Sequence, residues 1–515
     1  MSDMNHAELA ETQRRRAIRR AALRAPLRGA LCVKHTANAC CRRTVAGLTV
    51  AVLIAACAGC SVRRPYQSPV PNAPVAWSAS VPQPPDAESL SRWWETFGDD
   101  QLTGLVRRAI GGNLDVRTAI SRVREARATV RSTRTQLRPA ADATGSARAT
   151  GTGTEAGIAG TTQSYSLGID ASWELDVFGG IRSTVDAARA TADARDADLQ
   201  DVLISLTAEV ALDYIDTRSL QRRLEIARSN VNLQQETLEL TQFRAQAGLA
   251  TDLDVQQALS NVESTRAQIS LLESQVAQSV HAIAILIGRP PSELNAEFAS
   301  PAPIPEAPIE AALGVPADTL RRRPDVRSAE RQLAAQAEQV NAARADLYPS
   351  FRLAGSIGLE SLSIARLALP GAAFWSANPS VSTRLFDRRQ LHENLIVQNE
   401  RQEQAARTYE TVVLRALQEV EDSLTALAQE QVRRDHLAAA ANAAQQAADL
   451  SLQLYTAGLR DFRDVLDAQR SLLTLQDTLT SSGATVSSDL VSLFKALGGG
   501  WSAAEMLPEK VSSVP

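Results

Sequence analysis

The sequence predicts a mostly helical chain built from two copies of one plan, each with long coiled-coil helices and one hairpin of membrane β-strands. Three observations carry this prediction: an internal repeat at a spacing of 210 residues, apolar residues at heptad spacing, and short stretches in which apolar and polar side chains alternate. Four strands cannot close a barrel alone, and an open sheet edge is not tolerated in lipid. We therefore expect several copies to close one barrel together.

The repeat emerges when the chain is compared with itself. Asp325-Val326-Arg327 repeats Asp115-Val116-Arg117 at a spacing of 210. The same offset holds in two distant blocks, through the pairs Val130 and Val340, Pro139 and Pro349, Gly248 and Gly458, and Asp254 and Asp464. A solenoid repeat has about 20–45 residues, so a period this long indicates two domain-sized halves.

Residues 1–59 are predicted to be a lipoprotein signal peptide, whose first 40 residues suggest a start codon assigned too early. Residues 45–56 form the long apolar run, which follows Arg42-Arg43 and ends at small residues, as in a secretory signal. The run is too short for a membrane span. A cysteine at the cleavage point indicates lipidation, with Cys60 the favoured site and Cys57 the alternative.

Composition excludes several classes of protein. All five cysteines lie in the first 60 residues, so the body holds neither disulfides nor a cysteine metal site. The leader takes ten of the 54 Lys/Arg and three of the 58 Asp/Glu, which leaves a mature net charge of about −11 and disfavours nucleic-acid binding. His281, His392 and His436 are isolated, and Met506 is the only mature methionine. We expect no enzyme, no metal and no cofactor beyond the covalent lipid.

Residues 60–92 are rich in proline and serine, which favours an extended tether behind the lipid. The first half is expected over 93–313, with a helix over 113–137, a hairpin of strands over 140–178, and a long helical hairpin over 181–287 that turns at Gly248. The stretch 181–246 would reach about 100 Å as one helix. Its returning arm is shorter, so the helix 113–137 is expected to stack end to end with that arm.

The second half, expected over 314–501, has the same parts in the same order. They are a helix over 324–347, a hairpin of strands over 350–386, and a helical hairpin over 388–497 that turns at Gly458, with a tail over 502–515. Sustained heptads predict coiled-coil packing. They are clearest at Val465, Leu472, Leu479, Val486 and Leu493.

The strand prediction rests on a period of two. Between residues 165 and 175 an apolar side chain follows every polar one, and residues 351–360 and 375–385 alternate in the same way, although Pro379 weakens the last strand. A soluble sheet would show the same pattern. The lipoprotein signal and strands of about ten residues favour a membrane sheet.

The chain resembles the outer membrane factor family, the TolC/OprM-like lipoproteins that form the exit duct of tripartite efflux pumps. The resemblance covers roughly residues 60–501 and is carried by these motifs: Cys60-Ser61-Val62 with Pro65-Tyr66, Trp93-Trp94, Trp173 to Gly179, Gly314 to Glu330, Leu385-Phe386-Asp387, Gly458 to Arg470 and Ala496 to Trp501. Two positions depart from the family pattern. Arg388-Arg389 replace a Gly-Gly pair after the second hairpin, and Arg463 replaces an apolar residue near the second tip.

The resemblance implies a homotrimer with a 12-stranded barrel and a helical tunnel that extends from the outer membrane into the periplasm. Its implied partners are outer membrane lipid, a periplasmic adaptor protein and an inner-membrane transporter of the RND type. The duct would conduct drugs or other small toxic compounds passively. Alternatives are a duct for type I protein secretion and a periplasmic coiled-coil scaffold lipoprotein without a pore.

The resemblance also assigns roles to the helical turns. Asp464 and Asp467 lie one helical turn apart, and the family match makes them the acidic pair of a periplasmic gate, linked through Tyr455 and Arg460 to Asp254. Without the family match they would be a solvated helix face. The tips expected to meet the adaptor are Gly248, Leu249, Gly458 and Leu459, where simple helix capping is the other interpretation.

Overall fold

The computed structural model describes residues 62–69, 90–153, 155, 160–308 and 322–501. By its internal contacts the chain divides into Met1–Cys60 and Ser61–Pro515, and every described residue belongs to the second unit. The predicted signal peptide and both candidate lipidation sites, Cys57 and Cys60, therefore lie outside the described residues. Much of the predicted tether is also outside them.

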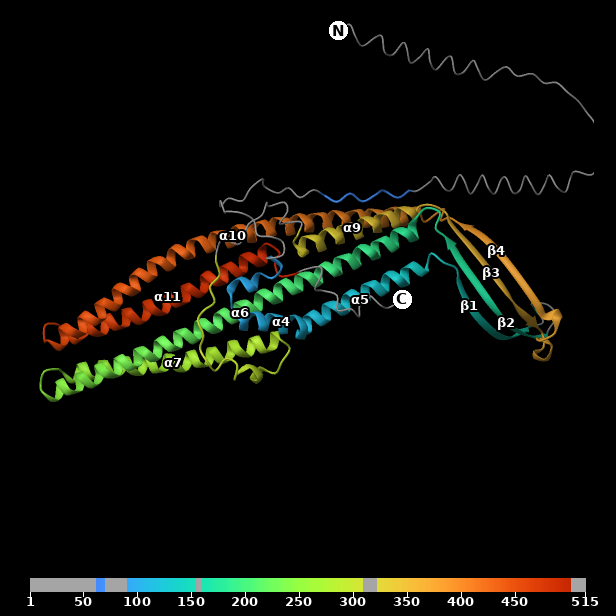
Figure 1. The fold of residues 1–515 in the computed structure, drawn as a ribbon. Helices are drawn as coiled ribbons and strands as arrows, with labels where there is room; N and C mark the ends of the chain where they lie inside the picture. Colours follow the sequence, from blue (N-terminus) through green and yellow to red (C-terminus); the bar gives the residue numbers. More distant parts are fainter. Residues whose placement is uncertain (1–61, 70–89, 154, 156–159, 309–321, 502–515) are drawn as a thin grey trace, which may run out of the picture. The chain divides into compact units, whose positions relative to one another are not determined.

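The first half opens with short helical elements and continues into two long helices (Figure 1). Its elements are η1 (Trp93–Phe97), α4 (Asp100–Gly112), α5 (Leu114–Thr135), β1 (Ala140–Thr152), β2 (Gly160–Leu175), α6 (Gly180–Gln246), α7 (Asp252–Leu286) and η3 (Pro291–Leu294). α7 returns along α6, as expected from the heptads. Of the described helices, α7 is the one whose length and composition would also suit a membrane span.

The second half repeats this order. Its elements are α9 (Pro324–Ala345), β3 (Ser350–Ser361), η5 (Ile364–Arg366), η6 (Pro370–Ala372), β4 (Ala373–Ser382), α10 (Arg388–Thr456) and α11 (Phe462–Ala496). α10 packs along α11, and Val465, Leu472, Val486 and Leu493 of the expected heptad are buried. β4 ends at Ser382, so Leu385 lies in the following turn rather than in the strand to which the alternation assigned it.

Both short helices stack end to end on the returning arms. In the first half, Asn113 caps α5 and its Nδ2 also donates to the carbonyl of Leu286 at the end of α7 (2.9 Å). A Cβ on Gly288, whose φ is +73°, would lie 2.4 Å from the carbonyl oxygen of Gly112. In the second half, Arg323 before α9 donates to the carbonyl of Ala496 at the end of α11 (2.8 Å). The stacking expected from helix lengths is therefore present in both halves.

The four strands form one antiparallel sheet in the order β1-β2-β3-β4. The central pair joins the two halves, because β2 of the first half pairs with β3 of the second. Pro379 lies in β4, an edge strand of the described sheet, where a residue without a backbone N–H is tolerated.

The core lies around the middle of α6, where η1, α4, α7 and α11 pack. Trp93 is fully buried and stacks on Phe494 of α11, with ring centres 5.4 Å apart. Gly500 closes this core from the other end of the chain: its N–H donates to the carbonyl of Leu90 (2.9 Å). A Cβ at Gly500 would lie 2.7 Å from the hydroxyl of Thr207, so no larger residue fits without a shift.

Candidate functional site

The sheet has one apolar face and one polar face. Across the three strand pairs, apolar residues oppose one another on a single face, as in Ile169 with Ile357 and Ile357 with Trp375. This face is exposed in the chain and includes Leu167, Ile169, Leu175, Leu353, Ile357, Trp375 and Val381. A continuous exposed apolar band across strands of 10–16 residues is suited to lipid rather than to water.

The opposite face is polar and its side chains bond to one another across strands. The hydroxyl of Thr144 donates to Asp170 (2.7 Å), and Ser146 bonds to Ser166 (2.8 Å). Arg352 of β3 lies 3.7 Å from Glu174 of β2. A sheet with lipid on one side and polar groups on the other is the arrangement of a barrel wall around an aqueous interior.

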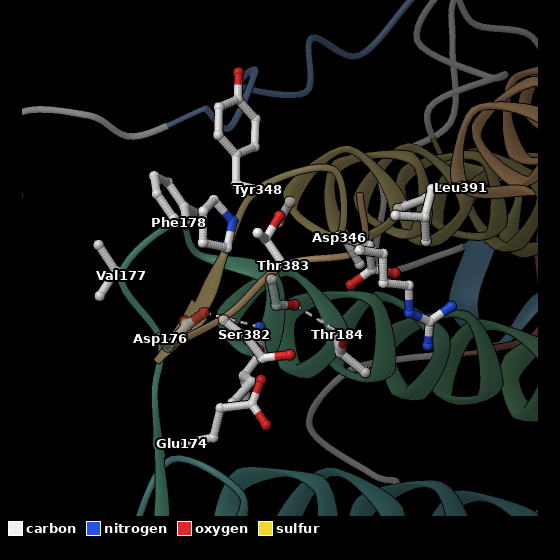
Figure 2. Close-up of a pocket in the computed structure, with 18 of the residues that line it drawn as sticks. Glu174, Asp176, Val177, Phe178, Thr184, Asp346, Tyr348, Ser382, Thr383 and Leu391 are labelled. Carbon is white, nitrogen blue, oxygen red and sulfur yellow. Dashed lines mark hydrogen bonds between the residues drawn. The ribbon is translucent and has the colours of Figure 1, made fainter. Parts of the chain in front are cut away.

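Where the sheet meets the helices, a cavity of about 760 Å³ lies between the starts of α6 and α10 and the end of α9 (Figure 2). Asp176 caps α6 here, because its carboxylate accepts from the N–H groups of Ile181 and Arg182 (both 3.0 Å). Phe178 stacks on Tyr348, with ring centres 4.8 Å apart, and both rings lie to one side of the cavity. These contacts fix the angle between the strands and the helices.

The same bend forms in the second half without the family's glycines. Gly179 precedes α6 with a φ of +82°, whereas Asp387 precedes α10 with a φ of −94° and makes no side-chain cap. Arg388-Arg389 therefore begin α10 directly. The bend that these arginines made uncertain is present, in a backbone conformation that does not require glycine.

Both helical tips end at a left-handed glycine. Gly248 and Gly458 have φ values of +76° and +78°, and the following N–H groups, of Leu249 and Leu459, reach back to Arg244 (2.8 Å) and Leu454 (2.9 Å). This is a Schellman-type cap, so Gly248 and Gly458 do cap their helices, which was the other interpretation of these residues. The side chains of Leu249 and Leu459 are about 70% exposed, at 68% and 71%. Both tips thus present an exposed leucine to the surroundings, and the first tip also exposes Phe243 and Leu253.

Each acid of the predicted pair, Asp464 and Asp467, lies beside the arginine four residues before it. Arg460 is 3.4 Å from Asp464, and Arg463 is 4.0 Å from Asp467. All four side chains are exposed, so the pairs contribute little to stability. Sequence reasoning noted Arg463 only as a departure in packing and missed it as the partner of Asp467, although the i,i+4 spacing was readable.

No hydrogen bond joins Tyr455 to Asp254 among the described residues. Tyr455 is 4% exposed in a cluster with Leu238, Val262, Phe462, Val465 and Leu466. Its hydroxyl is buried and has no hydrogen-bond partner among the described residues. Asp254 completes a capping box at the start of α7, where it accepts from the N–H and the hydroxyl of Thr251 (both 2.8 Å). The predicted links from Tyr455 and Arg460 to Asp254 therefore stay predictions about neighbouring copies.

A second arginine, missed from the sequence, ties the two tips together. Arg244 at the end of α6 lies over the Tyr455 ring, and its Nη1 donates to the carbonyls of Tyr455 (3.0 Å) and Thr456 (3.2 Å). Cations at a helix C-terminus interact favourably with its free carbonyls. The contact joins the helical hairpins of the two halves near their ends.

Above the tips the two hairpins meet through polar side chains. Gln469 of α11 donates to Thr237 of α6 (2.9 Å), and Arg470 of α11 donates to Asn261 of α7 (3.0 Å). Further along, Arg223 pairs with Asp477 (2.6 Å). Gln234 is buried on α6 with both polar atoms unpartnered among the described residues. This interface is therefore more polar than the apolar cluster around Tyr455.

A partly buried acid, Asp213, lies in the middle of α6. Burial raises the pKa of Asp213 to about 6, and the nearby carboxylates of Glu209 and Asp216 add to the shift. These acids are spaced along one face of the helix. As for metals, the described residues contain no group of three or more His, Cys, Asp or Glu side chains placed to hold an ion.

The described N-terminal segment, residues 62–69, runs along α9. Arg63 bonds to Glu338 through two nitrogens (2.9 and 3.1 Å) and lies 2.6 Å from Asp186 of α6. Asn341 bonds to the backbone of Arg64 in both directions, and Tyr66 donates to Glu330 (3.0 Å). Toward its N-terminal end the segment thus approaches the end of α9 that leads into β3.

Comparison with known proteins gives one consistent result. The family model for outer membrane efflux proteins matches residues 105–289 and 315–499, two segments whose starts are 210 residues apart, like the internal repeat. Nodulation protein T of Rhizobium leguminosarum bv. viciae is 32% identical over 470 residues, which cover 91% of this chain and 96% of that protein. The toluene efflux pump outer membrane protein TtgF of Pseudomonas putida is 32% identical over 478 residues, 88% of this chain and 96% of that protein.

The fold is shared with solved channels. The outer-membrane channel OprN superposes with a TM-score of 0.81 at 33% identity, covering 86% of this chain and 100% of that chain. The fold class expected from the sequence is thereby confirmed: a duplicated, mostly helical chain whose strands belong to a membrane barrel and whose helices belong to a tunnel. The sheet faces, the paired hairpins and these matches agree, and the chain belongs to the outer membrane efflux protein family.

Proposed function

We propose that three copies of this chain form the exit duct of a tripartite efflux pump, which conducts small toxic compounds from the periplasm to the exterior. The carrying observation is the two-faced sheet, apolar on one side and polar on the other, continued by helices of 67 and 69 residues. Four strands leave both sheet edges unpaired in one chain, and lipid does not tolerate them. Twelve strands from three copies would close a water-filled barrel.

The substrate is proposed as a class only. Relatives are named for the efflux of toluene and solvents and for the export of pyoverdine, which are unlike compounds. A duct that selects little would suit all of them. The duct has no energy source of its own in this proposal, so an inner-membrane transporter of the RND type supplies the work. A periplasmic adaptor would grip the tips at the exposed Leu249 and Leu459.

Lipid anchoring at Cys60 is also proposed. The contacts of Arg63, Arg64 and Tyr66 place the described N-terminal segment on α9, next to the helix end from which β3 enters the membrane. Only Ser61 separates Val62 from Cys60 in the sequence, so the chain between them reaches at most about 7 Å. An acyl group there would lie close to the lipid that the apolar sheet face contacts. Cys57 is the alternative site.

The test is conductance together with export. Purified protein in planar bilayers should open water-filled pores, and cells that lack the gene should accumulate a fluorescent dye that the wild-type gene clears. Trp375→Asp on the apolar face should abolish outer membrane insertion, whereas Ser376→Asp on the polar face should preserve it. Normal insertion of both variants, or the absence of pores from correctly inserted protein, would refute the duct.

A further inference from the structure

The junction between the two halves of one chain serves here as a template for the contact between two copies of the chain. β2 pairs with β3, and beyond the strand ends the ring of Phe178 stacks on Tyr348 at 4.8 Å and lies 6.4 Å from Phe351. On the polar face of the same pair, Glu174 and Arg352 lie 3.7 Å apart. Strand pairing, an aromatic contact and an opposite-charge pair therefore occur together where the second strand of one half meets the first strand of the other.

The equivalent elements at the outer edges are unpaired within the described chain. β1 and β4 lie on opposite sides of the sheet (Figure 1). Phe386, which follows β4 as Phe178 follows β2, has a 99% exposed side chain, and Leu385 beside it is 70% exposed. The turn before β1, which corresponds to the turn that carries Tyr348, is exposed at Arg138. The second half thus carries Phe386 without a ring or cation of the described chain packed on it, and the first half carries an exposed Arg138 at the position that corresponds to Tyr348.

The internal repeat allows the residue pairing of β2 with β3 to be projected onto β4 and the β1 of a second copy. The strand pairs fix the equivalence, because Ala143 opposes Ile169 in the first hairpin and Leu353 opposes Pro379 in the second, an offset of 210 for both strands. Applied to the pairs of β2 with β3, this offset places Val381 opposite Gly145 of a second copy. Val381 and Gly145 both lie on the apolar face, because Val381 opposes Phe351 and Gly145 opposes Leu167. A slip by one residue would mix the two faces, so the alternation supports this register independently.

Charge supports the same alignment. Asp142 of β1 lies opposite Asp170 of β2, an unfavourable pairing of like charges. In the projected register Arg384, two residues after the end of β4, lies opposite Asp142 of the second copy. The template pairs an arginine of β3 with an acid of β2; here an acid of β1 would meet an arginine after β4. The acid and the arginine exchange strands, and the two strands still carry opposite charges.

We propose that β4 of each copy pairs with the next copy's β1 so that Val381 opposes Gly145, and that Phe386 packs on the guanidinium group of the next copy's Arg138. The first-half equivalent of Tyr348 is Arg138, so the ring-on-ring contact inside the chain becomes a ring-on-cation contact between copies. A second copy is the fitting partner because only another β1 supplies the missing backbone pairing, the arginine and the acid together. This inference rests on the proposed trimer and names the contact that joins its copies.

Disulfide trapping tests the register in full-length protein in its own membrane. The variant with Val381→Cys and Gly145→Cys should form a ladder of covalent dimers and trimers on oxidation, since directly opposed residues have Cα atoms about 4.5–5.5 Å apart. The matched control combines Val381→Cys with Ala149→Cys, also on the apolar face but four residues, about 13 Å, out of register. Each single cysteine is a further control.

A trimer seen in detergent without the expected ladder, or a ladder formed by the Ala149 control instead, overturns the register while the proposed duct stands. A monomer in detergent would instead refute the proposed trimer. Contact with Arg138 is tested by a double-mutant cycle on the temperature at which the trimer dissociates. Phe386→Ala should lower that temperature in the wild-type background and have little further effect in Arg138→Ala, whereas Leu362→Ala, an exposed leucine beyond β3, should leave it unchanged. Additive losses would remove the contact from the proposal.

Discussion

The guanidinium carbon of Arg244 lies 4.5 Å from the centre of the Tyr455 ring, and the same side chain donates to the Tyr455 carbonyl (3.0 Å). Arg244 ends the long helix of the first half, and Tyr455 ends the long helix of the second half. The two tips are therefore tied by one side chain that acts on both a ring and a helix end. The predictions below begin with this region.

The first prediction concerns the gate. Arg460→Ser combined with Tyr455→Phe should raise single-channel conductance in planar bilayers severalfold, because both groups are proposed to bond to a neighbouring copy. Within one chain the Tyr455 hydroxyl has no partner among the described residues, and the exposed pair of Arg460 with Asp464 is weak, so folding should be unaffected. Arg407→Ser, an exposed arginine further along α10, is the control. An unchanged conductance would show that these residues have no gating role and form only a solvated helix face.

The second prediction concerns the charge at the tunnel end. Arg463→Gln should strengthen block by multivalent cations about two- to fivefold, since it leaves Asp467 without its basic partner. Asp464→Asn with Asp467→Asn should weaken the same block. Titration of hexaamminecobalt against conductance measures both. If block is insensitive to all three changes, the carboxylates do not line the conducting path.

The third prediction concerns pH. Burial raises the pKa of Asp213 to about 6, above the value of about 3.9 in an unfolded chain. The folded state therefore holds the proton more tightly, and stability falls as pH rises from about 4 to 6 and stays lower above that range. Asp213→Asn should raise the thermal unfolding temperature at pH 7–8 and leave it unchanged near pH 4. Glu236→Gln, an exposed carboxylate of the same helix, should show no such dependence.

The fourth prediction compares two glycines with the same backbone conformation. Gly248→Ala should cost about 1–2 kcal/mol, the strain of a left-handed residue, because a Cβ there meets nothing within 4 Å. Gly288→Ala should cost about 1–3 kcal/mol more, because its Cβ would press on the Gly112 carbonyl where α5 stacks on α7. Thermal unfolding in detergent gives the difference. Equal losses of stability in the two variants would mean that the chain at the contact between Gly288 and Gly112 can shift at no cost.

The fifth prediction concerns the anchor. Cys60→Ser should abolish incorporation of radiolabelled palmitate into the mature protein, while pore formation persists because the barrel holds the protein in the membrane. Cys57→Ser is the matched variant and should keep the label. The reverse outcome would assign the lipid to Cys57.

Regular elements could be predicted from the sequence because their causes are local. The period of two gave the sheet, and proline, glycine and the heptads gave helix ends within a residue or two of those of α6, α7, α10 and α11. Even the end-to-end stacking followed from unequal helix lengths. The internal repeat supplied the strongest argument, since each half checks the other.

Side-chain partners at the tips could not be predicted in the same way. Tyr455 and Arg244 are 211 residues apart, and no spacing rule brings them together; only the packing of α6 on α11, against which α10 also packs, does so. Helix α4 and its contacts around Trp93 were missed for a similar reason, because that amphipathic segment is short and its core is supplied by α6 and α11. The pairing of Arg463 with Asp467 was local and could have been read.

The position of Gly500 has a consequence for the order of events during biogenesis. Its N–H bonds to Leu90 and its missing side chain leaves room for Thr207 and Trp93, so the first folded residues are completed by residues near the end of the chain. A ribosome releases Trp93 some four hundred residues before Gly500. The core around Trp93 can therefore be completed only after nearly the whole chain has been synthesised, so that residues made late complete a part of the fold that was made early.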